Sequence, residues 1–222
     1  MQLTFLSSSL ALTKTYTQLP DGSIQKSSYP NVWEVTSINE ECKDLNDLVS
    51  LLNQHGQLGH CLLKGLVQRP LVKESRKDST DRNALTDWLC LDIDGLPNPR
   101  RVTENGKTTE RPLTVDQIMD SLGLGDVSYV LQWSGSQGII NNDIRCHIFI
   151  LLTKSVAAPL VKQWLIQKNH EVELFQSCQQ LTKTGNSLTW GLDITACQPD
   201  KLIYIAPPTL IGIKNPLKRQ SR

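Results

Sequence analysis

Apolar residues recur along the chain with two different periods, and these periods predict its helices and strands. Between Asp44 and His55 they recur every three or four positions, which predicts an amphipathic helix that ends before Gly56. Short runs that are apolar throughout, or that alternate with polar residues, are typical of strands. The same patterns predict further helices over 115–122, 155–168 and 172–181, and strands over 61–67, 87–93, 128–133, 145–152 and 202–205.

The order of these elements predicts an α+β or mixed α/β fold, because strands and helices alternate without a regular βαβ rhythm. The first forty residues hold short β-like runs, separated by turn signals at 20–22 and 29–31. We expect one domain over residues 1–211, with an N-terminal part over about 1–85 and a second part over about 86–211.

Three polar segments are expected to lack regular secondary structure. Residues 68–86 precede the strongest strand candidate, and residues 97–112 follow it as a loop. Residues 212–222 are basic and poor in apolar side chains, which is typical of a linker within a longer protein.

The composition is ordinary for a soluble globular protein, with 39% hydrophobic and 20% charged residues. The longest apolar stretch, 148–152, is far too short to span a bilayer, and the N-terminus lacks the basic segment of a signal peptide, so we expect an intracellular protein. The 23 basic and 22 acidic residues leave a net charge of +1. Proteins that bind nucleic acid usually carry a clear basic excess, so contact with a polynucleotide must come from a local patch or a partner domain.

The cysteines give no sign of a structural metal. No two of the six are close enough to form a Cys-x-x-Cys pair, so a structural zinc site is not predicted. The six are Cys42, Cys61, Cys90, Cys146, Cys178 and Cys197. Four of them, Cys61, Cys90, Cys146 and Cys197, lie in or beside apolar runs, and we expect these to be small buried hydrophobic residues in a reducing compartment.

Two carboxylates follow the apolar part of the strongest predicted strand. Side chains alternate between the two faces of a strand, so Asp92 and Asp94 point the same way while Leu91 and Ile93 point into the core. Adjacent unpaired carboxylates repel and raise each other's pKa, and a divalent cation removes that conflict. The pair is not specific to one reaction. Haloacid-dehalogenase-type phosphatases use such a pair as nucleophile and acid/base, and glycosyltransferases use it to hold a metal and a nucleotide sugar.

Two later segments have features of phosphate binding. The small residues Ser134, Gly135 and Ser136 follow an apolar strand, and a turn of this kind lets main-chain N–H groups approach phosphate oxygens. Further along, Arg145 and His147 share one face of a strand whose other face is apolar. Cationic and imidazole side chains together on such a face point to a bound anion.

A third carboxylate, Asp193, lies in an otherwise uncharged segment, which marks it as a candidate metal ligand. Lys201 begins the next predicted strand and is a candidate phosphate ligand.

Taken in order, the acidic pair, the Ser-Gly-Ser turn with the Arg-Cys-His strand, and Leu192-Asp193 resemble the archaeo-eukaryotic primase superfamily. The likeness is greatest to the primase-polymerases of phages, plasmids and other mobile elements, and it spans roughly residues 60 to 208. One position departs from the family pattern: Arg145 stands where the family often has serine, which puts the hydroxyl contact there in doubt.

The resemblance implies an α/β N-terminal unit packed on an RRM-like unit, with the active cleft between them. It also implies a bacterial, phage or plasmid-encoded enzyme that makes and extends primers from NTPs or dNTPs on single-stranded DNA, alone or with a fused or partner helicase. Two Mg²⁺ or Mn²⁺ ions would be held by Asp92, Asp94 and Asp193. The triphosphate would contact Ser134, Gly135, Ser136, Arg145, His147 and Lys201, and the initiating strand would contact a basic patch of Lys64, Arg76 and Arg82.

Two alternatives stay open. A haloacid-dehalogenase-type phosphohydrolase would use Asp92 as nucleophile, although Leu96 replaces the Thr or Val that is usual there. A non-catalytic RRM-like module of a replication initiator would present exposed aromatic residues on its strands, and Phe149 and Tyr204 are the candidates.

Overall fold

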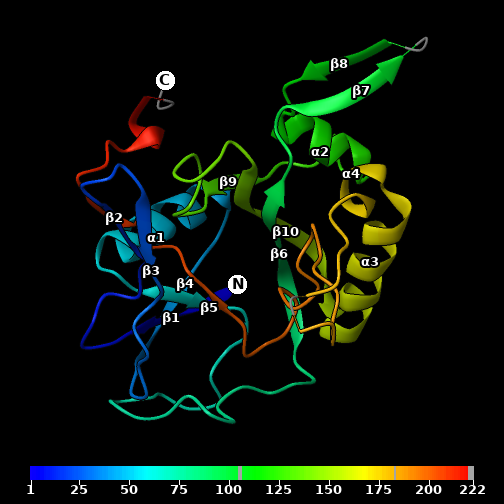
Figure 1. The fold of residues 1–222 in the computed structure, drawn as a ribbon. Coiled ribbons are helices and arrows are strands. Elements are labelled where there is room, and N and C mark those ends of the chain that lie inside the picture. The colour runs from blue at the N-terminus through cyan, green and yellow to red at the C-terminus, as the bar shows by residue number, and fades with distance from the viewer. Residues whose placement is uncertain (105–106, 183, 220–222) are drawn as a thin grey trace.

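The computed structural model describes residues 1–104, 107–182 and 184–219, which form two β-rich halves; α2, α3 and α4 lie on the outer side of the second half (Figure 1). The combination of helices with mostly antiparallel sheets gives an α+β fold, as expected. No helix in these ranges is long and apolar enough to cross a membrane.

The first half is built on a four-stranded sheet in the order β11-β5-β1-β4, so a strand from the end of the chain completes a sheet from its beginning. Helix α1 is capped by the Asp44 carboxylate, which accepts hydrogen bonds from the main-chain N–H groups of Asn46 and Asp47. This confirms the first predicted helix. The elements are β1 (Gln2–Ser7), β4 (Thr36–Glu41), α1 (Leu45–Gln57), β5 (Cys61–Leu63) and β11 (Leu202–Ile203).

A second sheet of the first half again joins the two ends of the chain. Strand β12 (Thr209–Ile211) pairs in parallel with β2 (Thr15–Gln18), and β2 pairs antiparallel with β3 (Ile24–Ser27). Residues 209–211 are therefore part of the first half. A 3₁₀ turn over Pro216–Arg219 lies within the segment that was expected to be a linker.

The second half is a three-stranded antiparallel sheet in the order β6-β10-β9, with helices on one face (Figure 1). Leu91, Ile93, Cys146 and Ile148 point to that face and form one core with the helices. The elements are β6 (Leu85–Leu96), α2 (Val115–Ser121), β9 (Val130–Trp133), β10 (Ile144–Ala157), α3 (Ala158–Glu171) and α4 (Glu173–Gln176).

The opposite face of this sheet packs against the first half over part of its length. Trp88, Cys90 and Phe149 from this face share a core with Phe5 and Leu52 of the first half. One continuous core therefore joins the halves, and it stops where the polar residues of β6 and β10 begin.

The prediction of a loop over 97–112 was wrong. Strands β7 (Arg100–Glu104) and β8 (Lys107–Arg111) form a hairpin that projects from the second half (Figure 1). Its residues are polar on both faces, so hydrophobic alternation could not reveal it. Cross-strand pairs such as Val102 with Thr109 join residues that favour strands.

Some predicted boundaries were also wrong. Strand β10 continues through Ala157, so α3 begins at Ala158 rather than at 155, with a proline in its first turn. Helix α4 and strands β5 and β11 are shorter than predicted. The six cysteines are free, and five of them are buried.

Candidate active site

Most of the predicted metal and phosphate ligands lie on the face of the β6-β10-β9 sheet that is turned toward the first half. In the antiparallel register, Asp92 is opposite His147, and Asp94 is opposite Arg145. On the other side of β10, His147 is opposite Gln132. Residues directly opposite one another in a sheet point to the same face.

The third carboxylate joins the same face. Ile93 forms a β-bridge with Leu192, and the Asp193 N–H donates to the main-chain carbonyl of Asp92 (2.9 Å). Asp193 is therefore opposite Asp92 on the free side of β6. We refer to the seven residues on this face as the polar array: Asp92, Asp94, Gln132, Ser134, Arg145, His147 and Asp193.

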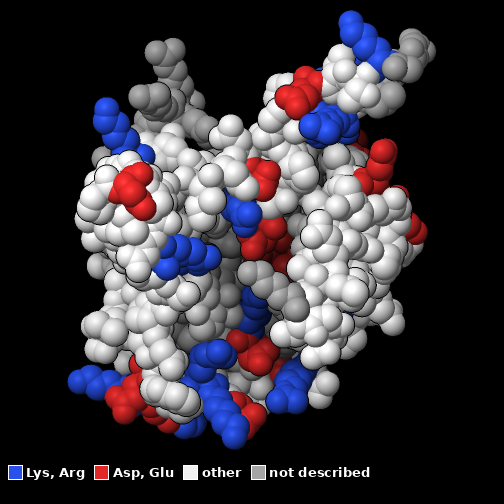
Figure 2. Space-filling model, in the orientation of Figure 1, with Lys and Arg blue, Asp and Glu red and all other residues white. Residues whose placement is uncertain are grey.

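The polar array has two rows that run across the strands. One row reads Asp193, Asp92, His147 and Gln132, and the other reads Asp94, Arg145 and Ser134. Carboxylates occupy the β6 side, whereas hydrogen-bond donors occupy the β10 and β9 side. Figure 2 shows acidic and basic side chains gathered in a hollow between the two halves.

Asn169 of α3 fixes the position of the Asp193 segment. Its side-chain amide donates to the Leu192 carbonyl (2.8 Å) and accepts from the Leu192 N–H (3.1 Å). Asn169 and Leu192 are both completely buried, so water cannot replace the Asn169 amide as the hydrogen-bond partner of these main-chain groups. A single side chain thus replaces the neighbouring strand that Leu192 would otherwise need.

Of the three carboxylates in the array, Asp92 is the one without an arginine or lysine bound to it. Burial raises its pKa, and the charges of Asp193 and Asp94 raise it further, while His147 and Lys201 act in the opposite direction. Its Oδ1 lies 3.6 Å from His147 Nε2. Burial also lowers the pKa of His147, although Asp92 opposes this shift.

The orientation of Gln132 decides which nitrogen of His147 carries the proton in the neutral ring. Gln132 Nε2 donates to the Ile205 carbonyl (3.3 Å), so Gln132 Oε1 faces His147 Nδ1 (3.3 Å) and accepts from it. His147 Nε2 then turns a lone pair toward the Asp92 carboxylate. Two acceptors in this arrangement are stable only with a proton or a metal cation beside them.

The other two carboxylates are each paired with a cation of the chain. Asp94 is bound by the Arg145 guanidinium. Asp193 accepts from Lys201 Nζ (2.6 Å) and from the Thr195 hydroxyl (2.8 Å). Burial acts to raise the pKa of Asp193, but Lys201 and Thr195 outweigh it and hold that pKa below its usual value. The pKa of Lys201 is raised, because Asp193 outweighs the effect of burial.

A bulge in β6 lets Arg145 reach Asp94. Leu96 is opposite Ile144 while Asp94 is opposite Arg145, which leaves Gly95 as the extra residue. Gly95 has φ +100°, and a β-carbon there would lie 3.0 Å from Arg145 Nη2. The strand continues through Gly95, whose positive φ favours glycine, and a larger residue there would require the Arg145 guanidinium to shift.

The Ser134–Ser136 turn extends the second row. The Ser134 N–H donates to the Arg145 carbonyl (2.9 Å), and the hydroxyls of Ser134 and Ser136 are 3.1 Å apart. Gln137 Oε1 accepts from the Arg145 N–H (2.6 Å). Gly135 lies beside Pro208 of the first half, and a β-carbon there would be in ordinary van der Waals contact with it, 3.4 Å from Pro208 Cδ.

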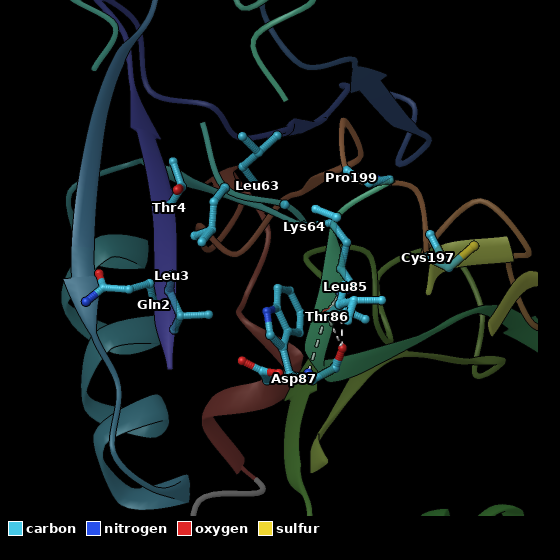
Figure 3. A pocket seen from close by; sticks show the side chains of 15 residues that line it. Gln2, Leu3, Thr4, Leu63, Lys64, Leu85, Thr86, Asp87, Cys197 and Pro199 are labelled. Atoms are coloured by element: carbon cyan, nitrogen blue, oxygen red, sulfur yellow. Dashed lines mark hydrogen bonds between the residues drawn. The ribbon is translucent and has the colours of Figure 1, made fainter. Parts of the chain in front are cut away.

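The expected basic patch of Lys64, Arg76 and Arg82 was not found as an exposed group. Lys64 is buried in a separate cavity, where its ammonium donates to the Trp88 carbonyl (3.0 Å) and to Thr86 and lies 4.0 Å from the centre of the Trp88 ring (Figure 3). Burial lowers its pKa to about 8. Because these partners occupy the ammonium, it cannot meet a template at the surface.

The two arginines of that patch are separately engaged. Arg76 donates to the Asp200 carbonyl (2.9 Å), and the exposed Arg82 lies 3.8 Å from Asp78.

The donor set suits a hard cation such as Mg²⁺ or Mn²⁺, since it consists of carboxylates with one imidazole. Among residues 1–104, 107–182 and 184–219, no group of three or more His, Cys, Asp or Glu side chains is arranged so that it could hold a metal ion. Two of the three carboxylates of the array are instead paired with cations of the chain, Asp94 with Arg145 and Asp193 with Lys201. The half-buried Asp92 carboxylate faces a histidine lone pair, so it is where a cation would relieve the most repulsion.

Several residues of the site were missed from the sequence. Gln132 could have been found, because it lies two positions before Ser134 on the same strand and must share its face. Asn169 and Thr195 gave no such signal. Comparison of the chain with protein-family models, with curated proteins and with solved structures found no match.

Proposed function

We propose that this chain is a metal-dependent nucleotidyl transferase of the primase-polymerase type, which extends primers from NTPs or dNTPs on single-stranded DNA. The two-row polar array carries this proposal. A nucleoside triphosphate with bound cations needs carboxylates for the cations and hydrogen-bond donors for the phosphate oxygens, next to one another. The array offers both across neighbouring strands, about 5 Å apart.

The residues divide by role along the rows. Asp92, Asp94 and Asp193 would hold Mg²⁺ or Mn²⁺, which activates the attacking 3′-hydroxyl and stabilises the leaving pyrophosphate. Arg145 would contact the phosphates, with the hydroxyls of Ser134 and Ser136 beside it, and His147 would join them when its Nε2 carries a proton. In this role Arg145 and Lys201 exchange their carboxylate partners for phosphate oxygens, which frees the carboxylates for the cations.

The fold supports the arrangement that the family resemblance implies. Two units meet along a shared core, and the polar array begins where that core ends. A substrate bound on the array would therefore lie between the halves. The position of Arg145 in place of serine adds a charge to this site, and a charged donor binds a phosphate oxygen more strongly than a hydroxyl does.

The deciding experiment is incorporation of labelled nucleotide by the full chain on primed and unprimed single-stranded DNA with Mn²⁺ or Mg²⁺. We expect metal-dependent products, and we expect Asp92→Asn/Asp94→Asn to reduce incorporation by about a hundredfold or more. Asp87→Asn is the matched control, since Asp87 is an exposed carboxylate of β6 outside the array, bound to Ser155. It should keep wild-type activity.

Two results would overturn the proposal. One is the absence of metal-dependent product, and the other is a product that the double variant makes as well as the wild type. A phosphatase activity that needs Asp92 and traps an aspartyl-phosphate would replace it with the phosphohydrolase. Binding of single-stranded DNA without any incorporation would favour the non-catalytic module.

A further inference from the structure

A lysine of the first half lies close to the polar array, because the Thr209 segment that is bonded to it also packs, through Pro208, against Gly135 of the Ser134–Ser136 turn. Lys14 directly precedes β2, and its carbonyl accepts a hydrogen bond from the Thr209 N–H (2.9 Å). Thr15 and Thr209 are partners in the parallel pairing of β2 and β12. The backbone of Lys14 is thus fixed by the pairing of β2, near the start of the chain, with β12, near its end.

An aromatic stack positions the Lys14 side chain. Its ammonium lies 4.7 Å from the centre of the Tyr29 ring, and Tyr29 is stacked on Tyr204 with 3.4 Å between ring centres. A cation over an aromatic face is attracted by the ring. Tyr204 directly precedes Ile205, whose carbonyl accepts a hydrogen bond from Gln132 of the polar array (3.3 Å), so the stack lies close to the array.

The ammonium of Lys14 lacks an anionic partner although it is half-buried. Within residues 1–104, 107–182 and 184–219, no carboxylate is within ion-pair distance of it. Burial lowers its pKa, and the charges of Lys26 and Arg145 lower it further, against the effect of Asp94 and Asp92. Cations thus crowd together here without a carboxylate of their own, as they do where an anion binds.

The Tyr16 hydroxyl is a second, independent sign of a missing partner. Tyr16 lies two residues after Lys14 and is completely buried, and no atom of the described chain meets hydrogen-bond geometry with its hydroxyl. The Ser136 hydroxyl is close enough to counteract the effect of burial on the pKa of Tyr16, and Arg145 and Asp94 also affect this pKa. A buried hydroxyl without a partner is costly, and this one is beside the phosphate-binding turn.

We propose that Lys14 and Tyr16 form a second wall of the phosphate site, so that a polyphosphate is held between the two halves of the protein. This inference rests on the proposed function and deepens it. The β10-β9 side of the array contacts the polyphosphate from one side, and the β2 sheet contacts it from the other. Lys14 supplies a charge to the phosphate oxygens, and Tyr16 donates a hydrogen bond.

The test is calorimetric titration of the full chain with inorganic tripolyphosphate at fixed ionic strength, without metal or template. Lys14→Met keeps the length of the side chain and its packing on Tyr29 but removes the charge, and we expect it to weaken binding about tenfold or more. Lys14→Arg keeps the charge and should bind within about threefold of the wild type. Tyr16→Phe removes only the unpartnered hydroxyl and should weaken binding without loss of stability.

Lys43→Met is the matched control, because it removes the same charge from an exposed lysine of the first half that is not among the charges acting on Lys14. A loss as large as that of Lys14→Met would mean a general effect of charge and would overturn the inference. Wild-type affinity in Lys14→Met, or no binding to the wild type, would also overturn it. None of these results depends on catalysis, whereas the incorporation assay with Asp92→Asn/Asp94→Asn tests the proposed function separately.

Discussion

Asn169 is the residue whose removal tests most directly how the third carboxylate is held in place. Its amide satisfies the N–H and the carbonyl of Leu192, and neither group can reach β6, since it is the Asp193 N–H that bonds to Asp92. Asn169→Ala leaves both groups buried without partners, at about 1–3 kcal/mol for each group. We expect the free energy of unfolding to fall by about 2–5 kcal/mol.

Urea unfolding followed by tryptophan fluorescence measures this change. Gln163→Ala is the matched control, since Gln163 is an exposed amide on the same helix, and it should alter the free energy of unfolding by less than about 0.5 kcal/mol. The reasoning is refuted if Asn169→Ala unfolds within that range of the wild type. A destabilised variant that keeps full nucleotide incorporation would show that Asn169 supports the fold without positioning Asp193.

Two further predictions concern the bulge and the buried histidines. Gly95→Ala should lower the free energy of unfolding by about 1–2 kcal/mol because of its positive φ, and should weaken binding of tripolyphosphate by displacing Arg145. The control, Gly123→Ala, has φ +76° with open space around it and should lower only the free energy of unfolding. Equal losses of tripolyphosphate affinity in the two variants would contradict the prediction. Burial lowers the pKa of His55 and of His60 below the 6.5 of the unfolded chain, so the unfolded state takes up protons first as the pH falls. The free energy of unfolding should therefore decrease below pH 6.5, and His55→Gln/His60→Gln should flatten that decrease in urea titrations between pH 8 and 5; an unchanged slope would argue against the assignment.

Which side chains of one strand share a face of the sheet could be predicted from the sequence alone. Strand alternation places Asp92 with Asp94, and Arg145 with His147, whatever the strands pair with, because successive side chains of a strand must point in opposite directions. Helix α1 was equally predictable, since its apolar period and its Asp44 cap are local features. The hairpin over 100–111 was not, because its polar strands carry no hydrophobic alternation.

Which residues of other strands and segments lie next to these side chains depends on the tertiary structure. Register between strands depends on long-range pairing, so the sequence could not say that Asp92 would meet His147 and Asp193. The same holds for Asn169, whose amide acts on a segment twenty-three residues away. Lys14 is brought beside the array because β2 and β12, which are far apart in the sequence, share a sheet, and such a pairing cannot be read from the sequence.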